Sequence, residues 1–80
     1  MNEYADSIHV CQSMQLTASA VLDDLTGNPD ALNIPAYREL VERVYMAARQ
    51  AACLARKLDD AETAKFTDHV CEQLTKLAKL

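Results

Sequence analysis

Apolar positions recur along the chain with the spacing of a helix face, beginning at its amino-terminal end. Two rows run side by side: Tyr4, Ile8, Cys11, Gln15, Ala18, Leu22 and Leu25 in the first, and Val10, Met14, Thr17 and Val21 in the second. Together they cover about 160° of a helix with 3.6 residues per turn, which is wide enough to contact two neighbours. We therefore expect an amphipathic helix over about residues 3–26.

All glycine and proline residues of the chain lie in one short window, from Gly27 to Pro35. Gly27 suits the left-handed conformation that often follows the end of a helix. Asn33 can cap free backbone amides, and Pro35 suits a first helical turn, where its missing N–H is not needed. The window therefore predicts that one helix stops and a second begins near residue 34.

The second apolar pattern is the most regular of the chain. It runs through Tyr37, Val41, Val44, Ala48, Ala51, Ala55 and Leu58 and is reinforced by Leu40, Ala47 and Leu54. Alanines at positions 47, 48, 51, 52 and 55 leave room for another helix to approach closely. We expect a helix over about residues 34–58.

The apolar pattern changes phase after Leu58. Extending the second row leads to Glu62 and Lys65, whereas the apolar row beyond this point is Phe66, Val70, Leu74 and Leu77, rotated by roughly 60 to 90°. Asp59 and Asp60 supply a cap and an acidic first turn for a new helix. We expect a break or sharp kink here and a third helix over about residues 60–79; a single long bent helix is the alternative.

The expected fold class is therefore all-α, with residues 1–80 forming a single helical domain. The architecture is a small antiparallel three-helix bundle or a helical hairpin with a kinked second helix. An 80-residue chain with one Phe, no Trp and many alanines has a core of little bulk. Because small domains bury a small fraction of their surface, we expect a homodimer that adds a second buried face.

Charge and cysteine content limit the possible partners. The formal net charge is −4, so the general attraction to phosphate that supports nucleic-acid binding is missing, and a nucleic-acid partner is not expected. The amino terminus lacks a cationic start and an apolar run, and no stretch approaches the roughly 20 apolar residues of a membrane span. We expect a cytoplasmic protein without membrane contact, whose three cysteines are reduced thiols.

His-Val-Cys occurs twice, at residues 9–11 and 69–71, and imidazole with thiolate is a ligand pair for zinc or copper. Residues two apart on a helix point about 200° away from each other, so neither segment can close on one ion. Cys11 lies on the apolar arc and His9 opposite it, as expected for a buried thiol and a solvated imidazole. The sequence predicts neither a metal nor another cofactor.

Enzymatic chemistry is not expected either. Cys11, Cys53 and Cys71 lie in helix interiors, whereas a nucleophilic cysteine needs a helix amino terminus or a neighbouring base. The acidic pairs Asp23–Asp24 and Asp59–Asp60 lie at helix ends, where carboxylates commonly cap or are solvated. Glycine-rich phosphate loops, nucleophile elbows and zinc-hydrolase patterns are absent from the sequence.

Five basic residues are concentrated in the second helix, a feature also found in DNA-recognition helices: Arg38, Arg43, Arg49, Arg56 and Lys57. They spread over about 140° of a helical projection and alternate with Glu39 and Glu42, four residues from basic partners, which favours a solvated face. The preceding loop of about eight residues is longer than a helix-turn-helix connection. A DNA-binding regulator remains a minor alternative.

Some apolar residues are not needed by the predicted core. Met46 and Cys53, seven residues apart, fall in the charged arc of the second helix, and Leu16 lies opposite the apolar arc of the first. The polar rim around Met46 and Cys53 consists of Glu42, Arg49, Gln50 and Lys57. An apolar centre with a polar rim resembles a small protein-binding surface. The alternative is that the third helix buries Met46 and Cys53.

These observations favour a non-enzymatic protein-binding module that acts by occupying a surface of another protein. In size, acidity and helical simplicity the chain resembles small inhibitors encoded by bacteriophages and mobile elements, including anti-CRISPR proteins and quorum-sensing anti-activators. No sequence motif carries this resemblance. The alternative is a homo-oligomeric helical scaffold or chaperone-type subunit, in which Met46 and Cys53 would contact a second copy.

Overall fold

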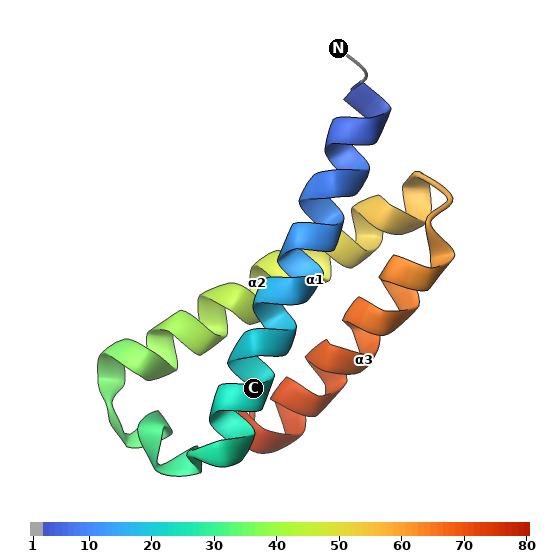
Figure 1. Cartoon of the computed structure of the whole chain (residues 1–80). Coiled ribbons are helices and arrows are strands. Elements are labelled where there is room, and N and C mark those ends of the chain that lie inside the picture. Colours follow the sequence, from blue (N-terminus) through green and yellow to red (C-terminus); the bar gives the residue numbers. More distant parts are fainter. Residues whose placement is uncertain (1–2) are drawn as a thin grey trace.

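The computed structural model describes the backbone of residues 3–80 and the side chains from Asp6 onward. It contains three α-helices, α1 (Glu3–Gly27), α2 (Pro35–Lys57) and α3 (Ala61–Ala78), and a short 3-10 helix, η1 (Pro29–Asn33). Consecutive helices run in opposite directions and form an all-helical bundle (Figure 1). Within residues 3–80 there is no strand, and no helix is long and apolar enough to cross a membrane. Tyr4, the start of the first predicted row, lies outside the described side chains.

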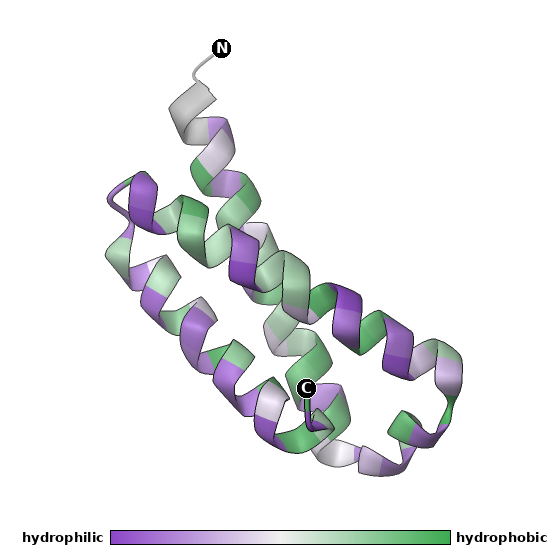
Figure 2. Cartoon of the chain, turned by 180° about the vertical axis from the view of Figure 1, so that it is seen from behind, coloured by the Kyte–Doolittle hydropathy of each residue, from purple (hydrophilic) through white to green (hydrophobic). Residues whose placement is uncertain are grey.

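The core lies where the three helices meet and is built from small and medium side chains. Leu25, Val41 and Leu74 are the largest apolar side chains that are fully buried, and Ala18 and Ala48 fill the spaces between them. A smaller cluster of Cys11, Ala55 and Ala64 joins the helices on the side of the α2–α3 turn. The first turns of α1 extend beyond that turn (Figure 1). Along α2, hydrophilic and hydrophobic residues alternate (Figure 2).

The predicted break after the second helix is confirmed. α2 ends at Lys57, and Asp59 adopts a left-handed conformation with φ of 61°. Asp60 is the N-cap of α3, and its Oδ1 accepts a hydrogen bond from the Thr63 backbone N–H at 3.3 Å. A left-handed residue followed by a capped amide ends one helix and begins another, so the chain forms a bundle of three helices.

Two predicted helix signals were wrong. Gly27 is the last residue of α1 and does not adopt a positive φ, because the chain continues without a left-handed turn into η1. Asn33 is the last residue of η1 and does not cap α2. Its neighbour Ile34 is the N-cap and makes no side-chain cap hydrogen bond, while Pro35 occupies the first turn as predicted.

The predicted apolar arcs are wider than the arcs that the fold buries. Five large apolar residues from the predicted rows are exposed: Val10, Leu40, Leu54, Phe66 and Leu77. On α3 the buried row instead includes Thr63 and Thr67, which were not predicted to be in the core. In a three-helix bundle each helix contacts only two neighbours, so the edges of a wide apolar arc stay uncovered.

Candidate protein-binding surface

Met46 and Cys53 lie on the outer side of α2, away from both neighbouring helices. Met46 is 62% exposed, and the Cys53 side chain is also exposed. The alternative in which α3 buries them is therefore wrong. The reason is the position of the buried row of α2, which follows Val41, Val44, Ala48, Ala52 and Ala55 on the opposite side of the helix.

Most of the predicted rim residues gather with Met46 and Cys53 around one shallow hollow of about 420 Å³. Its lining consists of Met46, Arg49, Gln50, Cys53, Leu54 and Lys57. Five of these six are residues that the sequence predicted for a binding surface. Leu54 was missed because its spacing assigned it to the core, yet it is 38% exposed at the edge of the apolar arc.

Two predicted residues do not belong to this hollow. Glu42 lies one turn before it and forms an ion pair with Arg38, with 3.8 Å between Oε1 and Nε. Leu16 is 69% exposed, but it lies on α1 and does not line the hollow. The structure therefore gives a surface centred on Met46 and Cys53, and Leu16 is a separate exposed apolar residue.

The charges around the hollow are mainly positive and uncompensated. The Arg49 guanidinium lies 5.6 Å from the centre of the Tyr45 ring, a cation–π contact that holds it beside the hollow. Arg49 and Lys57 have no ion-pair partner among the side chains that the structure describes, those of residues 6–80. In a chain of net charge −4, the hollow thus presents two unpaired cations beside exposed apolar side chains.

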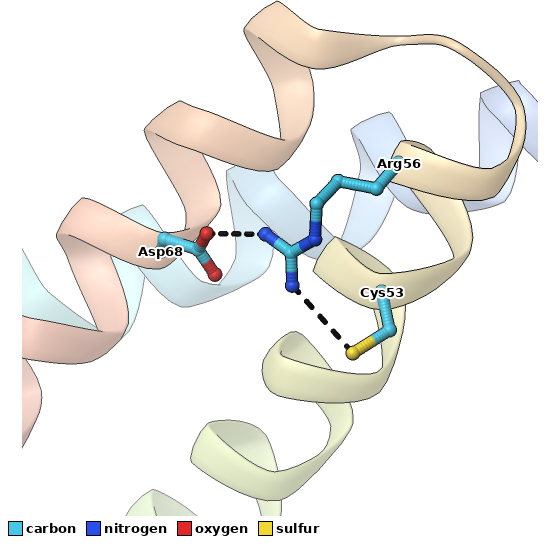
Figure 3. Close-up of polar contacts among 3 residues, drawn as sticks. All are labelled: Cys53, Arg56 and Asp68. Carbon is cyan, nitrogen blue, oxygen red and sulfur yellow. Dashed lines mark hydrogen bonds and ion pairs between the residues drawn. The ribbon is translucent and has the colours of Figure 1, made fainter.

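Arg56 contacts the Cys53 side chain at one end of the hollow. Its guanidinium donates to Asp68 of α3 and, at 3.6 Å, to the Sγ atom of Cys53 (Figure 3). The hydrogen bond to Asp68, followed by that to Cys53, raises the pKa of the Arg56 guanidinium, which remains charged. Arg56 therefore links α2 to α3 and touches the thiol, which remains exposed.

The other chemically reactive side chains are buried or isolated. Cys11 and Cys71 are 1% and 6% exposed, and burial raises the pKa of both thiols. His9 and His69 are exposed and do not share a face with the thiol two residues away. Among the described residues, no three His, Cys, Asp or Glu side chains come together in a group suited to a metal ion.

A second, larger hollow of about 650 Å³ was not predicted. It is open to solvent and lies between α1 and α3, lined by Gln15, Glu62, Thr63, Lys65, Phe66 and His69. Phe66, 49% exposed, is its only large apolar side chain, and the charges of Glu62 and Lys65 offset one another. Its lining therefore lacks both the apolar centre and the excess charge of the hollow on α2.

Comparison of the chain with known protein families, with curated proteins and with solved structures gave no match.

Proposed function

We propose that the chain is a non-enzymatic protein-binding module that acts by occupying a surface of another protein with the outer face of α2. The observation that carries the proposal is the hollow on α2, which brings together five residues selected from the sequence for this role. Apolar side chains at its centre and polar side chains around it match the composition of protein-binding surfaces.

The lining also indicates the chemistry of the partner. Met46, Cys53 and Leu54 provide an apolar centre for one inserted side chain, and Gln50 offers both a donor and an acceptor. Arg49 and Lys57 would attract carboxylates beside that inserted side chain. A partner segment with an apolar anchor flanked by Asp or Glu would therefore complement the hollow.

A module of this kind acts by blocking contact, as an inhibitor, an anti-activator or an adaptor. This action needs no reactive group, which agrees with the burial of Cys11 and Cys71. Binding to DNA receives less support, because three of the five cations of α2 are engaged in ion pairs: Arg38, Arg43 and Arg56. In the scaffold alternative, Met46 and Cys53 would contact a second copy of the chain and not a foreign protein.

The proposal is tested by capture of partners from a lysate of the source cells, with Met46→Asp as the variant that should lose binding and Phe66→Ser as its matched control. A protein retained by the native chain would be identified by mass spectrometry, purified and titrated by calorimetry. Loss of an apolar hot-spot contact at the centre of an interface costs about 2 kcal/mol or more, so we expect Met46→Asp to bind about 30-fold more weakly. Phe66→Ser, on another face, should bind like the native chain. Equal affinity of Met46→Asp and the native chain would contradict the proposal.

A further inference from the structure

Three residues of α2 form a second exposed line that the bundle leaves uncovered. Leu40, Ala47 and Leu54 are spaced by seven, and because two helical turns nearly equal seven residues, they lie within about 40° of each other around the helix. Leu40 is 48% exposed and Leu54 38% exposed, with the half-buried Ala47 between them. The line is apolar along its length.

Leu40, Ala47 and Leu54 lie on the flank of α2 that borders α1. The opposite flank of α2 faces α3, because Arg38 donates to the Ala78 carbonyl at 3.2 Å and Arg56 pairs with Asp68. On α1, Gln15 lies on the side that faces α3, because it lines a hollow together with residues of α3. The other side of α1 therefore borders α2, and it carries Val10, which is 61% exposed. The exposed apolar face therefore spans both helices, and its main line follows α2.

The exposed area of the chain is larger than its mass requires. The chain exposes 5394 Å² of solvent-accessible surface, whereas a folded monomer of 8.9 kDa typically exposes about 4,800 Å². The excess, about 600 Å², equals what each partner contributes to the smallest stable interfaces. The radius of gyration, 13.0 Å, likewise exceeds the roughly 11.6 Å of a typical domain of this length. One further copy would bring the exposed area per chain to an ordinary value.

We propose that a second copy of the chain covers this face, with the two α2 helices antiparallel about a two-fold axis at Ala47. A two-fold contact must be self-complementary, and Leu40 and Leu54 lie at equal distances on either side of Ala47. The axis therefore brings Leu40 of each copy against Leu54 of the other. Ala47, at the crossing point, allows the helix axes to approach closely.

The charges beside the line fit the same arrangement. Arg43 and Gln50 border the line on its solvent side, and the axis at Ala47 places Arg43 of one copy beside Gln50 of the other. A parallel pairing would instead set Arg43 against Arg43, which is unfavourable. Met46 and Cys53 lie roughly 100° farther around α2, so the dimer leaves them uncovered. Leu54 and Gln50 also line the hollow, so the second copy would border the partner site without covering its centre at Met46 and Cys53.

Light scattering at about 50 μM provides the first part of the test. We expect the native chain and Met46→Asp to have twice the mass of the 8.9 kDa chain. Ala47→Glu places two carboxylates at the axis and should yield a helical monomer by circular dichroism, with dimerisation at least about 30-fold weaker. A native mass of 8.9 kDa, or a folded Ala47→Glu variant that dimerises as tightly as the native chain, would overturn the proposal.

Disulfide cross-linking provides the second part and does not depend on the folding of Ala47→Glu. In the A47C/C53S variant, the two-fold axis brings the thiols introduced at position 47 close enough to bond when an added copper oxidant removes two electrons and two protons. We expect a covalent dimer on non-reducing gels. The native chain, with Cys53 on a different face, should not cross-link under the same conditions. Absence of cross-linking in A47C/C53S, or equal cross-linking of both proteins, would rule out an axis at Ala47.

Discussion

At the scale of single residues, burial separates side chains of the same type. Cys11 and Cys71 are buried, whereas Cys53 is exposed beside Arg56. The helical phase predicted this difference for Cys11 and Cys53, because one falls on an apolar arc and the other interrupts a charged arc. The burial of Thr67, 1% exposed and without a hydrogen bond for its Oγ1, was not predictable, because it depends on the rotation of α3 in the bundle.

Thiol labelling tests this assignment directly. At pH 8 and room temperature we expect a chromogenic disulfide reagent to modify one thiol of the folded chain within minutes and all three in denaturant. Peptide mapping should place the first label at Cys53. Burial raises the pKa of Cys11 and Cys71, so their reaction requires opening of the fold. Rapid labelling of Cys71 in the folded chain would show that α3 is packed differently.

The same pKa shifts fix the direction of a pH effect. The folded state holds the protons of Cys11 and Cys71 more tightly than the unfolded state does, because burial raises both pKa values. The two thiols contribute fully to the free energy of unfolding below the pKa that they have in the unfolded chain. This contribution is lost as the pH rises through their pKa values in the folded chain. We expect urea titrations to show a steeper alkaline loss of stability for the native chain than for Cys71→Ala. Identical alkaline slopes would contradict this expectation.

At the scale of the helices, the sequence predicted a break or sharp kink between α2 and α3, with a single bent helix as the alternative, and the structure shows two separate helices. The break was predictable because its signals are local: a change of apolar phase and a capping carboxylate at Asp60. The end of α1 was less predictable, because the conformation of Gly27 depends on how η1 connects the helices. The exposed edges at Leu40, Leu54 and Phe66 depend on which neighbours are present, which a single apolar pattern does not contain.

Gly27→Ala distinguishes the observed end of α1 from the one expected from sequence. Gly27 has no positive φ, and a Cβ atom added there would meet nothing within 4 Å. Alanine should therefore raise the free energy of unfolding by about 0.5–1 kcal/mol, since glycine loses more backbone entropy in a helix. Urea titration measures this change. A loss of stability would instead indicate a left-handed Gly27, where alanine is strained.

At the scale of the whole molecule, α2 has three distinct sides around its axis. Val44 and its row face the core, the line through Ala47 is uncovered, and Met46 and Cys53 form the outer hollow. The candidate surface was predictable as far as Met46, Cys53 and their rim, because apolar residues within a charged arc are visible in the sequence. The inclusion of Leu54 was not predictable, because tertiary packing decides whether a residue at the edge of the apolar arc is covered.

The most direct test of this division is the melting temperature of Met46→Asp compared with that of Val44→Asp, followed by circular dichroism. Val44 is 8% exposed in the core, so an aspartate there would bury an unpaired carboxylate and cost several kcal/mol, enough to unfold most of the chain. Met46 is 62% exposed, so its replacement should change the stability by no more than about 0.5 kcal/mol and the melting temperature by a few degrees. If Met46→Asp unfolds the chain as severely as Val44→Asp, then Met46 belongs to the core and the outer face of α2 is not a binding surface.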